Sequence, residues 1–154
     1  MLMTLARACD PDFADYDLKK LTDDRTILRR ETGLDFIKPG DNGRLALDLD
    51  DVAALCGYAD LRRAKLRYPV KLAGSIMSRV RDAMRAYPDE AQFTVVQLAN
   101  GSVFTLPTSK LDLSSGYTSG SCLLAATIID ARTLRDRVQQ AIEAYEPEAE
   151  DAAA

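Results

Sequence analysis

The dipeptide Asn100-Gly101 separates two apolar segments, Phe93 to Leu98 and Ser102 to Leu106. A two-residue turn of type I′ needs positive φ at both central positions, and Asn and Gly adopt that conformation more readily than other residues. We therefore expect the two segments to pair as an antiparallel β-hairpin.

An amphipathic helix is predicted just before this hairpin, from Pro69 or Val70 to Ala86. Apolar residues recur there every three or four positions, which places them on one helical face. Pro88 ends the helix, because proline cannot donate the next backbone hydrogen bond. We expect the apolar face to belong to the core; its members are Leu72, Ile76, Val80, Ala83, Met84 and Tyr87.

Further elements are predicted on both sides of this pair. Alternating leucines indicate a half-buried strand over 44–49, which would form a second hairpin with Phe36-Ile37 across a turn signal at 39–43. The apolar run Cys122 to Ile129 is predicted to be a central strand. Asp130 then caps a final helix, whose apolar face comprises Leu134, Val138, Ile142 and Tyr145.

These elements predict a single small α+β domain over residues 1–146, because 154 residues are enough for one core. The expected layout places central helices between antiparallel β-hairpins and closes with a C-terminal helix. Residues 147–154 are expected to be a disordered acidic tail, since they hold three acids and no apolar residue larger than alanine.

Charge is unevenly distributed along the chain. Residues 61–85 hold eight of the 20 Lys and Arg residues and one acid, Asp82. Residues 1–60 are acidic, and the last twelve residues hold five acids and no basic residue. The formal net charge of −4 therefore conceals a positive block in an acidic chain. A fold that keeps these segments apart would make the molecule dipolar.

The beginning of this block carries a short sequence pattern. Two helices are predicted there, over 52–56 and from about Asp60 to Arg67, with Gly57 as the break between them. Small Ala53 and Gly57 are four residues apart, and the segment 51–67 resembles the helix-turn-helix of bacterial and phage regulators. The resemblance implies that the second helix turns four basic residues towards phosphates or base edges: Arg62, Arg63, Lys65 and Arg67.

The candidate surface extends into the following helix, where basic residues lie off the apolar stripe and are expected to face solvent or a partner. Nucleic acid is the commonest partner of such a patch. An acidic protein surface is the alternative, and pairing with the acidic residues 1–60 inside the fold is a third interpretation. The candidate binding residues are Arg62, Arg63, Lys65, Arg67, Lys71, Arg81 and Arg85.

Composition removes much enzyme chemistry. The chain has no histidine, which excludes His general bases, Ser-His-Asp and Cys-His dyads and His-ligated metals. Its three cysteines, Cys9, Cys56 and Cys122, are far apart, which argues against a zinc site or a disulfide framework and favours buried free thiols. We assign no catalytic residue, no metal and no cofactor.

The sequence also bears on location. No apolar run approaches the roughly 20 residues of a membrane span. The apolar stretch at the start of the chain is too short, and is interrupted too soon by charged residues, to be a signal peptide. We therefore expect a cytoplasmic protein that does not bind membranes.

The sequence thus predicts a non-enzymatic binding protein. The leading hypothesis is a nucleic-acid-binding regulator of a bacterial or phage system that uses the basic helical patch. The alternative is a protein-interaction module, an inhibitor or adaptor that binds a protein through the same patch or through the acidic N-terminal half. A homodimer is compatible with both. The Ser/Thr/Gly-rich loop at 107–121 is left without an assigned role.

Overall fold

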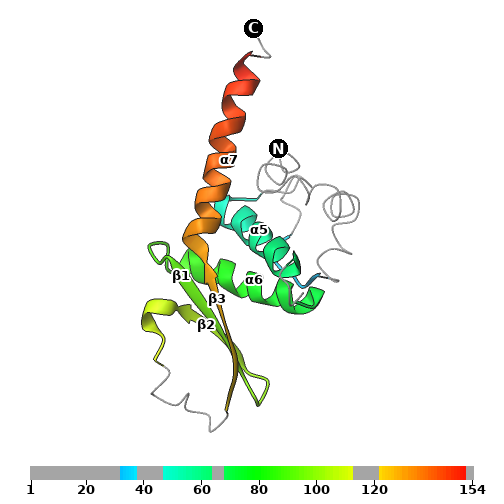
Figure 1. Ribbon diagram of the computed structural model, residues 1–154, viewed down its shortest axis with the longest axis vertical. Helices are drawn as coiled ribbons and strands as arrows, with labels where there is room; N and C mark the ends of the chain where they lie inside the picture. The colour runs from blue at the N-terminus through cyan, green and yellow to red at the C-terminus, as the bar shows by residue number, and fades with distance from the viewer. Residues whose placement is uncertain (1–31, 38–46, 64–67, 113–121, 152–154) are drawn as a thin grey trace.

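The computed structural model describes residues 32–37, 47–63, 68–112 and 122–151, with side chains as far as residue 143. It is a small single domain of mixed α+β architecture with a three-stranded antiparallel sheet and a C-terminal helix, as predicted (Figure 1). The elements in chain order are α5 (Leu49–Arg63), α6 (Val70–Ala86), β1 (Gln92–Leu98), β2 (Val103–Pro107), the 3-10 helix η1 (Thr108–Lys110), β3 (Leu123–Asp130) and α7 (Ala131–Asp151).

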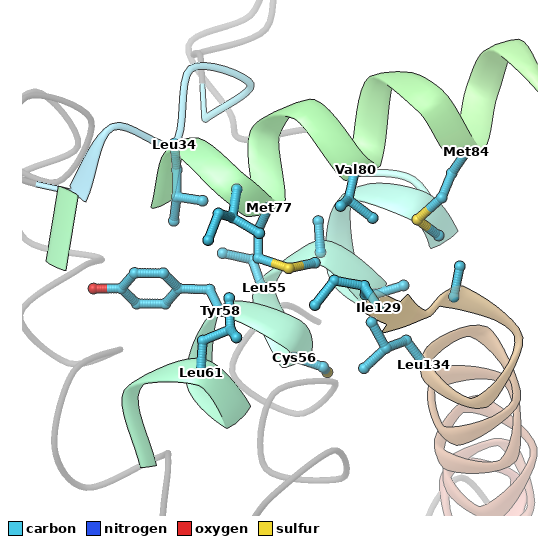
Figure 2. Packing of buried hydrophobic residues seen from close by; sticks show 14 of the residues in the cluster. Leu34, Leu55, Cys56, Tyr58, Leu61, Met77, Val80, Met84, Ile129 and Leu134 are labelled. Atoms are coloured by element: carbon cyan, nitrogen blue, oxygen red, sulfur yellow. The ribbon is translucent and has the colours of Figure 1, made fainter. Parts of the chain in front are cut away.

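The helices and the sheet share one core. In Figure 1, α6 lies between the sheet and α5, and α7 passes beside α5 before it projects away from the body. Phe93 and Val95 of the central strand β1 are fully buried and join side chains of α5, α6 and α7 in one apolar cluster. Figure 2 shows Met77 of α6 and Leu134 of α7 within it. The core therefore sits between the sheet and the helices.

The predicted hairpin is confirmed, but its turn is one residue longer than expected. The carbonyl of Leu98 accepts a hydrogen bond from the Gly101 amide, and the Leu98 amide donates to the carbonyl of Ser102. Residues 99–101 therefore form a three-residue loop, in which Gly101 has φ of 87°. A turn followed by a left-handed glycine is the usual form of such loops.

The predicted apolar stripe of α6 is largely confirmed. Four of its six residues are buried, Leu72 is half-buried, and Tyr87 lies beyond the helix with 41% of its surface exposed. The C-terminal helix also begins as predicted, because the Asp130 carboxylate accepts a hydrogen bond from the Thr133 amide at 3.0 Å. The four stripe residues that are buried are Ile76, Val80, Ala83 and Met84.

Gly57 does not break a helix. It lies inside the continuous helix α5, where a Cβ atom would meet Met77 Cε at 2.4 Å and Leu134 Cδ1 at 3.0 Å. Glycine therefore serves close packing against α6 and α7 rather than a turn. The prediction of two short helices separated at Gly57 is therefore wrong. The helix-turn-helix resemblance depends on a turn at Gly57, and the chain makes no turn there.

Two strand predictions also need correction. Leu47 and Asp48 are not in a strand, and Leu49 begins α5, so the predicted strand is wrong at its described end; residues 38–46 lie outside the described part. The apolar run after Cys122 forms β3, but the strand order β2-β1-β3 makes it an edge strand rather than a central one. Most of its residues are exposed.

The ends of the chain and the cysteines complete the comparison. α7 continues through the expected helix end at Pro147 to Asp151, and the disorder of the tail stays a prediction. Cys56 is buried and forms no disulfide, as expected, whereas Cys122 is exposed, and Cys9 lies outside the described residues. Among the helices that the structure describes, none combines the length and apolarity needed to cross a bilayer.

Candidate functional site

The basic block is divided between the two ends of an antiparallel helix pair. The beginning of α5 and the end of α6 lie together, because Arg81 Nε is 2.7 Å from Asp51 Oδ1 and Arg85 Nη2 is 3.2 Å from the same oxygen. Arg85 also pairs with Asp48. These two predicted binding residues are therefore engaged inside the fold, as the third interpretation of the sequence proposed.

The partners of these arginines form the N-terminal cap of α5. Asp48 Oδ1 accepts a hydrogen bond from the Asp51 amide at 2.9 Å, and Asp51 Oδ2 accepts one from the Asp48 amide at 3.1 Å. This reciprocal arrangement satisfies amide groups that a helix start otherwise leaves without partners. The Arg81 guanidinium also lies 5.2 Å from the centre of the Phe36 ring.

Electrostatics favour the charged forms of Asp48 and Arg81. Partial burial on its own would raise the pKa of Asp48, but the hydrogen bond from the Asp51 amide and the charge of Arg85 outweigh it and lower that pKa. Burial likewise would lower the pKa of Arg81, but hydrogen bonds to Asp82 and Asp51 raise it. The side chain of Asp51 is 5% exposed, whereas those of Arg85 and Asp48 are 42% and 55% exposed, so the cluster joins α5 to α6 and reaches the surface on its Arg85 side.

Two further acids of α5 are paired with α7. Arg135 Nε donates to Asp50 Oδ1 at 2.8 Å, and its other nitrogens donate to the carbonyls of Met84 and Pro88. Arg137 Nη1 donates to Asp60 Oδ2 at 2.6 Å. The acids of α5 are thereby neutralised by arginines of α6 and α7.

Basic residues without acids between them extend from the end of α5 to the middle of α6. The sequence from Arg62 to Arg79 contains no acid at all. Arg63, Lys71 and Arg79 are exposed, and Arg62 is half-buried. We call the four described residues, Arg62, Arg63, Lys71 and Arg79, the basic junction; Lys65 and Arg67 belong to the same stretch of sequence but lie outside the described residues.

Arg79 is a candidate that the sequence reasoning missed. It follows Lys71 by about two helical turns of α6, and it is off the buried stripe. The same criterion selected Arg81 and Arg85, which turn back onto α5 instead. Helical spacing alone does not distinguish an arginine that faces solvent from one that reaches a neighbouring helix.

The start of α6 and the end of α5 both lie at the basic junction, and their helix dipoles have opposite signs there. α6 begins after Pro69 with no side-chain cap and no acid in its first turn, so no residue of that turn offsets the positive end of its dipole. Arg62 and Arg63 lie in the last turn of α5, where basic residues favourably oppose the negative end of that dipole. Arg62 Nη1 also donates to the carbonyl of Tyr68 at 2.7 Å, which closes the connection between the helices.

A second exposed feature lies on β3. Ile129 is opposite Phe93 and faces the core, whereas Ile128 is opposite Thr94 and Ala126 is opposite Val96, on the other face of the sheet. Ile128 is 56% exposed and Leu124 is 68% exposed. We call the large apolar residues of β3 that are exposed, Leu123, Leu124 and Ile128, the outer stripe; the sequence reasoning missed it, because an apolar run looks the same in a central strand and in an exposed one.

Comparison of the chain with protein-family models, with curated proteins and with solved structures finds no match. Within the described ranges, no group of three or more Cys, Asp or Glu residues is arranged to hold a metal ion.

Proposed function

We propose that this chain is a non-enzymatic nucleic-acid-binding protein, a regulator that contacts phosphates through the basic junction. The observation that carries the proposal is the sorting of charge by the fold. Arg81 and Arg85 are paired with Asp51 of α5, and the sequence from Arg62 to Arg79 contains six basic residues and no acid. Basic side chains concentrated in this way along the chain attract the closely spaced phosphates of a nucleic acid.

The proposal concerns phosphate contacts and not the reading of base edges. The expected helix-turn-helix break is absent from Gly57, so no recognition helix is assigned. The described junction offers arginine and lysine side chains, which bind phosphates irrespective of sequence. We therefore expect affinity that depends strongly on salt and weakly on the nucleic-acid sequence.

The test compares two double variants that lose the same charge. Lys71→Ala/Arg79→Ala removes two exposed residues of the basic junction, and Lys110→Ala/Arg132→Ala removes two exposed basic residues elsewhere. Electrophoretic mobility shifts with duplex DNA, duplex RNA and single strands should weaken strongly for the first variant. The second variant should bind nearly as the wild type does. Equal losses in both variants would mean that net charge, not the junction, governs binding.

The competing function is a protein-interaction module, and the outer stripe of β3 favours it. Exposed apolar side chains on an edge strand are typical of a surface that pairs with another chain. If the wild type binds no nucleic acid at low salt, while substitutions on β3 disrupt a complex with a protein, this second function replaces the first.

A further inference from the structure

The connection between α5 and α6 is closed at its base by hydrogen bonds to Tyr68. The Tyr68 amide donates to the carbonyl of Leu61 at 3.3 Å, and Arg62 Nη1 donates to the carbonyl of Tyr68 at 2.7 Å. Both polar groups of the Tyr68 backbone are therefore bound to the last turn of α5. Because α6 starts two residues later, at Val70, the position of Tyr68 determines where α6 begins.

The side chain of Tyr68 is held as well. Its ring packs against the apolar cluster of the core, and its hydroxyl is 3.5 Å from Thr127 Oγ1 of β3. A residue that is held at its backbone and at its ring has little freedom, so α6 starts from a fixed point. Arg62 contributes strongly to that point, because a hydrogen bond from a charged guanidinium is stronger than one between neutral groups.

Arg62 differs in exposure from other members of the basic junction. Lys71 and Arg79 are exposed, whereas Arg62 is half-buried and donates to a carbonyl of the protein itself. We infer that Arg62 is a positioning residue, which fixes the start of α6, and with it Lys71, against the end of α5 and does not neutralise a phosphate. This role rests on the proposed function and narrows it, because it assigns phosphate contacts to Lys71 and Arg79.

A positioning residue and a phosphate contact affect binding in different ways. Binding is tighter when the cations are already held in place, because less freedom is lost on association. The slope of log affinity against log salt instead counts the phosphates that the protein neutralises. Loss of a positioning residue therefore lowers the affinity and leaves the slope unchanged, whereas loss of a phosphate contact changes both.

Two variants of Arg62 lose the same charge but differ in their ability to donate a hydrogen bond. Arg62→Gln keeps an amide donor for the Tyr68 carbonyl, and Arg62→Met has none. In fluorescence anisotropy with a labelled duplex, Arg62→Met should bind on the order of fivefold more weakly than the wild type, and Arg62→Gln within about twofold of it. Both should keep the wild-type salt slope.

Two single-charge variants calibrate this measurement. Lys71→Ala should give a slope shallower by about 0.9. Arg132→Met, which removes one charge at an exposed position of α7, should bind as the wild type does. Equal losses of affinity in both Arg62 variants, with a slope shallower by about 0.9 in each, would make Arg62 a phosphate contact and overturn the inference.

Hydrogen exchange at the start of α6 separates the positioning role from the proposed function. The Ala73 amide donates to the carbonyl of Pro69 at 2.9 Å in the first turn of α6. Without nucleic acid, this amide should exchange faster in Arg62→Met than in the wild type, and nearly as in the wild type in Arg62→Gln. Unchanged exchange in Arg62→Met overturns the positioning role even if the wild type binds nucleic acid. Faster exchange in a protein that binds no nucleic acid overturns the proposed function instead.

Discussion

At the scale of single residues, two glycines show how close packing dictates sequence. Gly57 admits Met77 of α6, and Gly74 of α6 admits the backbone of Thr32, whose carbonyl oxygen would be 1.5 Å from an added Cβ atom. Neither requirement can be predicted from neighbouring residues, because each depends on a segment distant in the sequence. A glycine after an apolar stretch resembles a helix end, and that resemblance led to the wrong break at Gly57.

Gly74→Ala should destabilise the protein by about 1–3 kcal/mol, since the Thr32 carbonyl belongs to the backbone and cannot rotate away. Urea denaturation measures the change, and Ser75→Ala on the same helix serves as the control. In an open helix, replacing glycine by alanine stabilises by about 0.5–1 kcal/mol. A gain of that size would show that α6 does not approach Thr32 as closely as described.

Asp48→Asn should isolate the charge of the α5 cap, because asparagine can still accept the hydrogen bond from the Asp51 amide. The pKa of Asp48 is lowered in the folded protein, so its charge stabilises the fold at any pH above the ordinary pKa of 3.8. This contribution is lost as the pH falls through the lowered pKa of the folded protein. We expect the variant to be less stable by less than about 1 kcal/mol at neutral pH. The difference should disappear in acid; a difference that grew on acidification would contradict this assignment.

At the scale of elements, local patterns predicted most of what lies in the second half of the chain. The spacing of apolar residues identified α6 and the start of α7, and Asn100-Gly101 identified the β1–β2 hairpin, because these signals depend on residues close in sequence. The order of strands in the sheet does not depend on residues close in sequence. The run that forms β3 was assigned to the centre of the sheet, and only the pairing of β1 with both neighbours shows that it is an edge.

Ile76 provides a graded test of the α6 core. It is 1% exposed, so removing its methyl groups leaves space that the close-packed core cannot fill. Ile76→Val should cost about 0.5–1.5 kcal/mol and Ile76→Ala about 2–5 kcal/mol in the free energy of unfolding. Chemical denaturation of both variants checks the order and size of the effects. Two values near zero would require the helix to be rotated about its axis.

At the scale of the whole molecule, the fold determines which basic residues pair with acids, whereas the sequence shows only where the charges lie along the chain. The sequence predicted a basic patch of seven residues. The structure pairs Arg81 and Arg85 with Asp51, adds exposed Arg79 in the middle of α6, and places Arg62 and Arg63 in the last turn of α5 and Lys71 in the first turn of α6. Ion pairs between helices are tertiary contacts, so the sequence shows the charge block but cannot show which of its members pair with acids.

The salt dependence of nucleic-acid binding tests the central claim most directly. Fluorescence anisotropy with a labelled duplex, measured over a range of salt concentrations, gives the slope of log affinity against log salt. We expect a steep negative slope for the wild type, and a slope shallower by about 0.9 for each phosphate that Lys71→Ala/Arg79→Ala no longer neutralises. The charge-matched Lys110→Ala/Arg132→Ala should keep the wild-type slope. No binding by the wild type at low salt, or the same slope in all three proteins, would contradict the assignment of the basic junction as the binding surface.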